Sequence, residues 1–527
     1  MNPAAIFYLV QLLWAIPSTV FSRPSLSLNT SQFLVHSLPG NPALPDSWAG
    51  RLPIPERKGN NIFFWLFDAE DAAYDDNLIT KANRPGIIVW LNGGPGCSSL
   101  IGLTTGNGPI SFDGNSTRLV ENPYSWTKLG HVLYVDQPVG TGFSTASSLV
   151  RSNEQVTADF ALWLHEFFRW FPHLLSKNVH MMGESYAGIF VPYFVAALME
   201  GNYSLPINLR SMSLGDGSWG NAAAMSSVAM GRYMHTQKNR LNVSTDILSA
   251  FASADKICGF EAVLKEANTY PPEGKIRIPG DPEWVNYRRR QSLDLARRDG
   301  SSLGILDGSC DEDPSTPAEV HSSILNSSCY GPCATFSTAE NYMYASSTCF
   351  SIYDLTHNCS TINPIPLLEE YFSQPDVQSA LHIGDSGTYT ACNDTILATL
   401  EGVSLSVEPP EYEILPSLVT NHSISLHIYN GELDMLINHI GTELSLQNMT
   451  WRGAQGFQRK PNNAFYVNDA TPDHRTSSSQ GAKAGIWAAE RGVSYHLFEG
   501  AGHSVFATKQ RQMFAFVRDV VIEGKAG

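Results

Sequence analysis

The chain lacks several features that would assign it to whole classes of protein. It is short of positive charge, since 34 lysines and arginines stand against 50 acidic residues and the formal net charge is −16. A surface that acidic repels nucleic acid and anionic membranes, so we expect neither as a partner. Beyond the first residues, no apolar run approaches the roughly 20 residues of a membrane-spanning helix. Internal repeats and long low-complexity tracts are also missing, which excludes a solenoid and argues against disorder.

Cysteines are few, and their spacing does not indicate a metal site. Cys329 and Cys333 form one close pair, but no second pair and no histidine pair stands at a ligand spacing. We therefore expect no metal and no cofactor. The number of cysteines is even, which in an oxidising compartment predicts four disulfides. The cysteines are Cys97, Cys258, Cys310, Cys329, Cys333, Cys349, Cys359 and Cys392.

The start of the chain predicts export. Residues 1–22 contain an uncharged apolar run from Ala4 to about Ile16, as in a secretory signal peptide. Asn-x-Ser/Thr sequons, the acceptors of N-linked glycans, agree with a secretory route that ends in a vacuole or outside the cell. The sequons begin at Asn29, Asn115, Asn202, Asn242, Asn326, Asn358, Asn393, Asn421 and Asn448.

The apolar runs predict an α/β fold. Runs at 87–91, 131–136 and 178–182 each end in a turn, and a helical apolar period at 157–171 separates the last two. Short buried strands that alternate with helices predict a mostly parallel central sheet with helices on its faces. In such sheets, ligands gather beyond the carboxyl ends of the strands.

The chain is too long for one uninterrupted core. Its 527 residues exceed the roughly 250–300 that a single hydrophobic core supports. Residues 219–405 hold seven of the eight cysteines and many loop-like stretches, and strand-like sequence returns after them. We therefore expect a core made of residues 23–218 and 406–527, with a disulfide-stapled cap inserted at 219–405. The sequence does not indicate the oligomeric state.

A serine stands on a predicted sharp turn. Residues 183–188 read Gly-Glu-Ser-Tyr-Ala-Gly and lie between a short strand and a helical apolar pattern. Small neighbours let the strand and the helix nearly touch, and such a turn lifts the hydroxyl of Ser185 above the sheet. A serine hydroxyl becomes a nucleophile only when a base removes its proton.

Two later residues complete a catalytic triad with Ser185. Asp434 follows an apolar strand and a turn, and His503 lies in a glycine-rich loop after the apolar run 493–498. Each alone is typical of a turn or of a structural histidine, but their order after the serine fits this architecture. We predict Ser185 as nucleophile, His503 as general base and then acid, and Asp434 as the group that orients the imidazole.

An oxyanion formed at Ser185 requires backbone amides that point inward. The amide of Tyr186 supplies one, and the glycine-rich loop at 92–97 supplies the other. No Gly-Lys-Ser/Thr follows this loop, which argues against a phosphate-binding role.

Together these stretches resemble the serine carboxypeptidase family of the carboxypeptidase Y type. The matching blocks are WLNGGPGCSSL, DQPVGTGFS, GESYAG, NGELD and GAGHS, in that order. The resemblance implies an α/β-hydrolase fold and the removal of C-terminal residues from peptides at acid pH through an acyl-enzyme. It places the triad at the three residues named above, the oxyanion amides at Gly94 and Tyr186, and a disulfide between Cys97 and Cys392.

The resemblance also implies a role for Glu184. A substrate's free C-terminal carboxylate would be bound by Asn92 and by the protonated form of Glu184. Two facing carboxyl groups bind each other only when they share a proton. Peptidase activity is therefore expected to be highest in acid and to fall as Glu184 loses its proton.

The chain departs from the family at three places. Gly106 stands where a glutamate commonly joins the carboxylate-binding network, Ile437 stands where some members have cysteine, and residues 504–506 read Ser-Val-Phe in place of Met-Val-Pro. These changes leave the triad intact and alter substrate recognition. Two other functions therefore stay open: an acyltransferase or esterase on the same scaffold, and a catalytically silent secreted glycoprotein that binds partners through its cap.

Overall fold

The computed structural model describes residues 28–40, 43–70, 86–200, 203–278, 333–384, 386–404, 408–467 and 481–525. The expectations for the signal peptide at 1–22, for Cys310 and Cys329, and for the sequons at Asn202 and Asn326 lie outside these residues.

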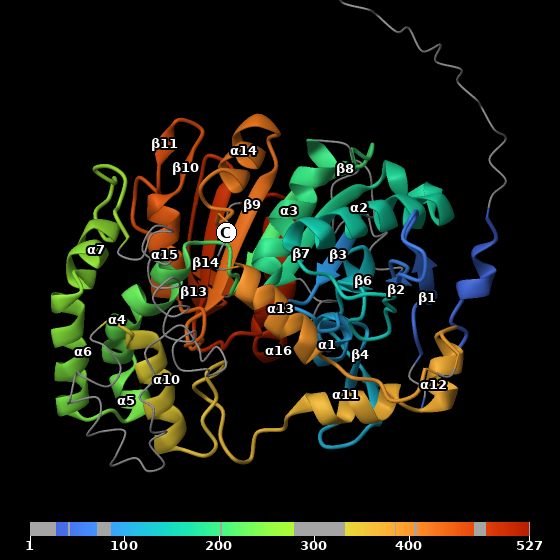
Figure 1. The fold of residues 1–527 in the computed structure, drawn as a ribbon, viewed down its shortest axis with the longest axis horizontal. Coiled ribbons are helices and arrows are strands. Elements are labelled where there is room, and N and C mark those ends of the chain that lie inside the picture. The colour runs from blue at the N-terminus through green and yellow to red at the C-terminus, as the bar shows by residue number, and fades with distance from the viewer. Residues whose placement is uncertain are drawn as a thin grey trace, which may run out of the picture.

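The strands form one large sheet and two small ribbons. The bounds of the strands are β1 Ser47–Pro53, β2 Asn61–Phe67, β3 Ile87–Leu91, β4 Ile110–Phe112, β5 Leu119–Glu121, β6 His131–Asp136, β7 Asn178–Glu184, β8 Asn208–Gly215, β9 Ser425–Gly431, β10 Thr450–Trp451, β11 Ala454–Gln455, β12 Asn463–Val467, β13 Ala482–Glu490 and β14 Val493–Phe498. The large sheet has ten strands in the order β1-β2-β6-β3-β7-β8-β9-β14-β13-β12. Its six central strands, from β6 to β14, are parallel, and antiparallel strands flank them at both edges (Figure 1).

Helices cover both faces of this sheet. Their bounds are α1 Leu100–Gly102, α2 Asn153–Trp170, α3 Ala187–Met199, α4 Ala229–Thr236, α5 Lys238–Leu241, α6 Thr245–Ile257, α7 Phe260–Ala267, α10 Thr335–Ser346, α11 Pro364–Phe372, α12 Pro375–Ala380, α13 Asp394–Ser404, α14 Ile414–Asn421, α15 His439–Asn448, α16 Val505–Thr508 and α17 Gln510–Phe516. Short 3₁₀ and π turns are η1 Thr30–Phe33, η3 Leu103–Asn107, η4 Trp126–Lys128, η5 Pro172–Ser176, η6 Ala224–Val228 and η7 Val517–Ile522. The expected α/β fold with a mostly parallel sheet is confirmed.

Strand β3 shows why the sequence builds two cores. All five of its residues are buried, and successive side chains point to opposite faces. Ile87, Val89 and Leu91 belong to one core, with apolar side chains of α2 and α3. Ile88 and Trp90 belong to the other, with α16, α17 and η7. Because both faces of the strand are buried, its sequence is a continuous apolar run.

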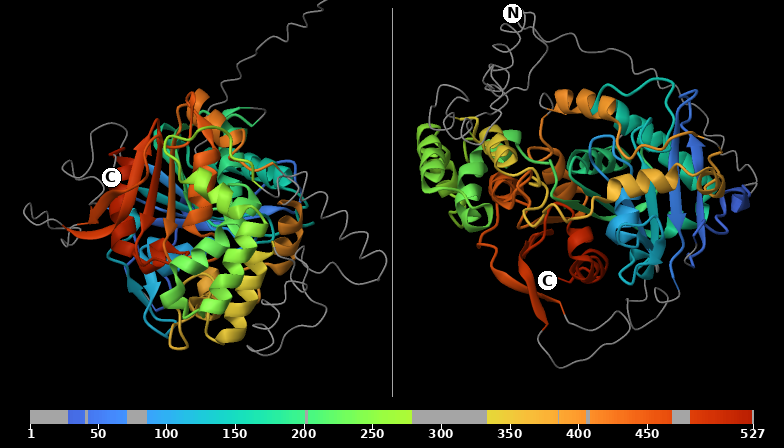
Figure 2. Two further views of the ribbon diagram at one scale, coloured as in Figure 1. Left: turned by 90° about the vertical axis from the view of Figure 1, so that its left-hand side faces the viewer. Right: turned by 90° about the horizontal axis from the view of Figure 1, so that it is seen from below.

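The expected cap segment contains two kinds of structure. Helices α4 to α7 and α10 share small cores of their own, and they lie together at one end of the molecule, away from β1 and β2 (Figures 1 and 2). Helices α11, α12 and α13 instead add side chains to the two main cores. Disulfides join Cys258 to Cys333 and Cys349 to Cys359. The boundaries expected at 219 and 405 stay a prediction.

The described sequons differ in exposure. Two of them are half-buried and hydrogen-bonded: Asn393 donates to the carbonyl of Gly140, and Asn448 accepts from the amide of Ile276. The others are exposed, at Asn29, Asn115, Asn242, Asn358 and Asn421. Among the helices described here, none has the length and apolarity to cross a membrane.

Candidate active site

Four neighbouring strands bring their following loops to one edge of the sheet. Strands β7, β8, β9 and β14 are adjacent and parallel, so their carboxyl ends lie together. Ser185 follows β7 directly, Asp216 follows β8 directly, and Asp434 and His503 lie in the loops after β9 and β14. The three predicted triad residues and one unpredicted carboxyl therefore share this edge.

Ser185 occupies a sharp turn between β7 and α3. Its φ of 63° lies in the left-handed region that non-glycine residues rarely adopt. Its carbonyl accepts hydrogen bonds from the amides of Gly188 and Ser218, at 2.8 and 3.1 Å. A Cβ on Gly93 would lie 2.5 Å from the nitrogen of Tyr186 and 2.9 Å from Cβ of Ser185. The absence of that carbon lets the glycine loop rest directly on the turn.

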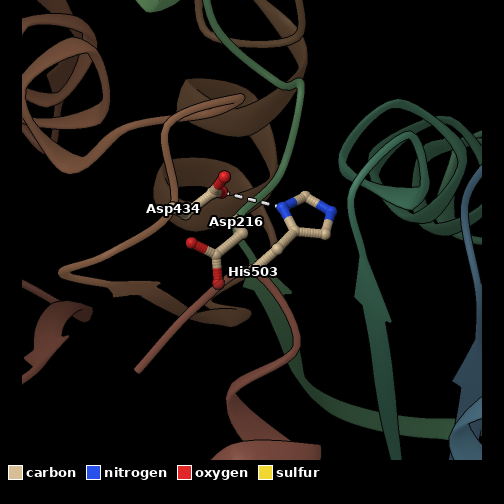
Figure 3. A group of neighbouring side chains, drawn as sticks. All are labelled: Asp216, Asp434 and His503. Atoms are coloured by element: carbon tan, nitrogen blue, oxygen red, sulfur yellow. Dashed lines mark hydrogen bonds and ion pairs between the residues drawn. The ribbon is translucent and has the colours of Figure 1, made fainter. Parts of the chain in front are cut away.

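His503 and Asp434 form a buried hydrogen-bonded pair. Nδ1 of His503 donates to Oδ2 of Asp434 at 2.7 Å, because a carboxylate can only accept (Figure 3). The other oxygen of Asp434 accepts from the amides of Leu436 and Ile437, at 2.9 and 3.3 Å. Ile437 therefore contributes its backbone to the site whatever its side chain. This pairing leaves Nε2 of His503 as the ring nitrogen that can take a proton.

The environment of His503 favours its protonated form. Burial acts to lower the pKa of the imidazole, but the charge and hydrogen bond of Asp434, together with the charge of Glu184, outweigh it. The pKa of His503 is raised above its ordinary value. An imidazole placed in this way accepts a proton readily and holds it beside Asp434.

A hydrogen bond joins the neighbours of Ser185 and His503. The hydroxyl of Ser504 donates to Oε1 of Glu184 at 3.1 Å. Since Glu184 precedes the serine and Ser504 follows the histidine, this bond fixes the two loops side by side. Oε2 of Glu184 is buried and has no hydrogen-bond partner within the described part of the chain.

The pKa of Glu184 lies well above that of an ordinary glutamate. Burial raises its pKa to about 7, against the opposing effects of His503 and Ser504 and with a further rise from Asp434. The side chain is therefore a neutral acid below about pH 7 and can donate a hydrogen bond from an otherwise unpaired oxygen.

The glycine loop at 92–97 lies against this turn. Oδ1 of Asn92 accepts from Nε1 of Trp90 at 2.8 Å and from the amide of Gly102 at 3.1 Å, which leaves the Asn92 side-chain nitrogen as its remaining donor. Gly94 follows the glycine that contacts Tyr186. A disulfide between Cys97 and Cys392 anchors the loop to the segment before α13.

Two departures from the family pattern pack on each other. A Cβ on Gly106 would lie 2.7 Å from the carbonyl carbon of Phe506 and closer still to its oxygen. Phe506 ends the Ser-Val-Phe stretch that follows His503. Position 106, where the resemblance would lead one to expect a glutamate, therefore has no room for a side chain.

Sequence reasoning missed two residues at the site. Tyr353, in the loop closed by Cys349 and Cys359, places its ring 5.3 Å from that of His503, and its carbonyl accepts from the His503 amide at 2.7 Å. No local pattern marked it. The sequence does contain a signal for Asp216, because this residue follows an apolar strand and stands between two glycines.

One cluster in the described chain has the composition of a metal site. Single ligand atoms of Asp216, Asp434 and His503 lie within 4.8 Å of one another (Figure 3). Two of these residues already use Oδ2 and Nδ1 to bond each other. These two atoms are therefore engaged with each other and are not free ligands.

Known proteins resemble this chain over most of its length. The profile described as "Serine carboxypeptidase" matches residues 39–523. The chain is 43% identical over 532 residues to a carboxypeptidase Y homolog of Arthroderma benhamiae, covering 99% of this chain and 100% of that protein. It is 31% identical to carboxypeptidase sxa2 of Schizosaccharomyces pombe, covering 80% of this chain and 81% of that one.

Among solved structures, the fold is similar to that of Kex1Δp, a prohormone-processing carboxypeptidase from Saccharomyces cerevisiae. The TM-score is 0.64 at 20% identity, and the alignment covers 93% of this chain and 96% of the other. At that identity, the likeness shows a shared fold. The profile match and the identity to the Arthroderma protein show more: the chain belongs to the serine carboxypeptidase family and is a serine-type carboxypeptidase, a hydrolase that acts on peptides.

Proposed function

We propose that this enzyme releases C-terminal residues from peptides with a free C-terminus, at acid pH, through an acyl-enzyme on Ser185. The observation that carries the proposal is the buried His503–Asp434 pair, tied to the Ser185 turn by the bond between Ser504 and Glu184. The pair supplies a base, and the turn presents a hydroxyl that a base can activate.

The proposed reaction uses these groups in the following order. Nε2 of His503 takes the proton of Ser185 as the hydroxyl attacks the last peptide carbonyl, and Asp434 stabilises the imidazolium. The amides of Gly94 and Tyr186 stabilise the oxyanion. His503 then gives its proton to the departing amine, and a water molecule, activated by the same imidazole, hydrolyses the acyl-enzyme.

Recognition of the free C-terminus is assigned to Asn92 and Glu184. The unpaired Oε2 of Glu184 is buried beside the turn, and burial raises the pKa of this acid to about 7. In acid it therefore donates to the substrate carboxylate, and above about pH 7 its own charge repels that carboxylate. The side-chain nitrogen of Asn92 provides a second donor.

Gly106 supports a second candidate function on the same scaffold. Because no side chain fits at this position, the carboxylate site contains one acid where the family commonly has two. A weaker carboxylate site favours an enzyme that accepts esters, or that transfers its acyl group to an alcohol. We retain this alternative for that reason.

Substrate pairs that differ only at the C-terminus separate the two functions. We expect kcat/KM for a free-acid peptide to exceed that for its C-terminal amide by about 100-fold at pH 5, as two lost hydrogen bonds to a charged group would give. Ser185→Ala should release nothing. Equal rates on acid, amide and ester would support the esterase, and no labelling of Ser185 by an organophosphate would support a silent binding protein.

We also propose that the protein follows the secretory pathway. The apolar run at 1–22 and the exposed sequons support passage through the secretory pathway, to a vacuole or the cell exterior. Glycan mapping by mass spectrometry should find occupancy at the five exposed sequons and none at Asn393 and Asn448.

A further inference from the structure

Asp216 is a buried carboxyl at the site that the triad does not use. It follows β8, its backbone φ is 41°, and its side chain has no exposed surface. Oδ1 accepts from the side-chain nitrogen of Asn430 at 3.1 Å and from the amide of Gly431 at 2.9 Å. Oδ2 is buried as well and accepts no hydrogen bond from the residues described.

The carboxyl groups of Asp216 and Asp434 are close neighbours. An oxygen of each, and a ring nitrogen of His503, lie within 4.8 Å of one another. Figure 3 shows the Asp216 carboxyl beside that of Asp434, while His503 is bonded only to Asp434. Two buried carboxylates at this separation cannot both ionise comfortably, so one of them holds a proton.

The hydrogen bonds decide which carboxyl is charged. Asp434 accepts N–H groups on both oxygens, from Leu436, Ile437 and His503. Asp216 accepts on one oxygen only. Charge is therefore stabilised better on Asp434, and the proton belongs on Oδ2 of Asp216.

The wider surroundings of Asp216 lead to the same assignment. The titratable groups that face it are Asp434, Glu184, His503, Tyr233, Tyr429 and Tyr495. Only the histidine in this set can become positive. Burial first, and then the charge of Asp434, raise the pKa of Asp216 well above its ordinary value.

We propose that Asp216 is a positioning residue: it carries a proton on Oδ2 and donates it as a hydrogen bond to Asp434, holding that carboxylate ionised and fixed beside His503. The inference rests on the triad of the proposed function. An acid in this place adds a fourth donor to Asp434 without adding a second negative charge next to the imidazole.

The charge state of Asp216 is tested by the variant Asp216→Asn. Asparagine has nearly the same shape, stays neutral, and presents an N–H in place of the O–H. The readout is the rate of labelling of Ser185 by diisopropyl fluorophosphate between pH 4 and 8, which reports the titration of His503 without a peptide substrate. We expect the midpoint of its acid limb to move by less than about 0.3 pH unit.

An ionised Asp216 would give the opposite result. Its replacement by asparagine would then remove a negative charge near His503, and the acid limb would move to lower pH by about one unit or more. That shift would overturn the proposal. Asp255→Asn is the matched control. Burial raises the pKa of this carboxyl, which belongs to α6 and lies against Gly231 of α4, to about 7, and its loss should leave the limb unmoved.

The positioning role is tested by a pair of variants at the pH plateau. Asp216→Ala, which lacks the donor, should label at least about tenfold more slowly, whereas Asp216→Asn should keep at least about a third of the rate. Equal losses in both would overturn the role. If the alanine variant does not fold, the pH profile of the asparagine variant still tests the protonation of Asp216, on which the role depends.

The labelling assay also separates this inference from the proposed function. Wild-type enzyme that is not labelled at any pH would refute the triad itself. Labelled wild type with a shifted Asp216→Asn profile would refute only the role of Asp216.

Discussion

At the scale of single residues, the mechanism proposed above gives His503 and Glu184 opposite requirements for protons. His503 must be neutral to accept the proton of Ser185, and Asp434 raises its pKa. Glu184 must be protonated to bind a substrate carboxylate, and burial raises its pKa to about 7. The proposed activity is therefore limited by protonation of the imidazole on the acid side and by ionisation of the carboxyl on the alkaline side.

Replacing Glu184 by glutamine tests the alkaline limit. Because the pKa of Glu184 is about 7, wild-type kcat/KM for a free-acid peptide should fall about tenfold for each pH unit above that value. Glutamine donates an N–H at every pH, so in Glu184→Gln this fall should be absent between pH 7 and 8.5. The measurement is the pH profile of kcat/KM, with the C-terminal amide of the same peptide as control. A fall that persists in the variant would remove Glu184 from carboxylate binding.

At the scale of elements, the two loops that meet beside Ser185 are held together by close backbone packing. The π turn η3, which contains Gly106, lies against the carbonyl of Phe506 at the start of α16. Ser504, in the same stretch, bonds Glu184. Gly106 therefore leaves room for the backbone of the segment that follows His503.

A pair of glycine variants tests this packing. Gly106→Ala should lower the free energy of unfolding by about 1–3 kcal/mol, because its Cβ would meet the Phe506 carbonyl carbon at 2.7 Å. Gly402→Ala, in α13 with nothing within 4 Å of the added carbon, should be neutral or stabilise by up to about 1 kcal/mol. Urea denaturation measures both. Equal stability of the two variants would contradict the close approach.

At the scale of the whole molecule, the sheet that carries the site also limits its stability in acid. Three histidines on β7, β9 and β14 are buried, and burial lowers their pKa values to about 3 for His180 and His496 and about 4 for His427. The folded protein keeps them neutral, while the unfolded chain protonates them below about pH 6.5. The contribution of these three histidines to stability is therefore full above that pH and is lost progressively as the pH falls toward 3.

Replacing one of these histidines should make the free energy of unfolding depend less steeply on pH. Each fully buried histidine contributes a slope of roughly 1.4 kcal/mol per pH unit between pH 6.5 and its folded pKa. His180→Asn, which can keep a hydrogen bond to Ser211, should reduce the slope of unfolding free energy by about that amount between pH 4 and 6. The exposed His235→Asn serves as control. An unchanged slope in His180→Asn would mean that this histidine is protonated in the folded state.

The sequence alone determined the parts of this protein that depend on local order along the chain. Continuous apolar runs such as 87–91 predicted strands buried on both faces, because covering both faces removes the usual alternation. The small residues around Ser185 predicted the turn, and the order of Ser185, Asp434 and His503 predicted the elements that carry them, at the ends of strands that the fold makes adjacent.

Only the tertiary structure decided which distant groups meet and what their contacts do to them. The placement of Asp216 beside Asp434, the lack of space at Gly106 and the burial of Asn393 each join segments that are hundreds of residues apart. The protonation of Glu184 likewise depends on how deeply the folded chain buries it. Such contacts and desolvation arise from the packing of the whole chain, so no local pattern of residues encodes them.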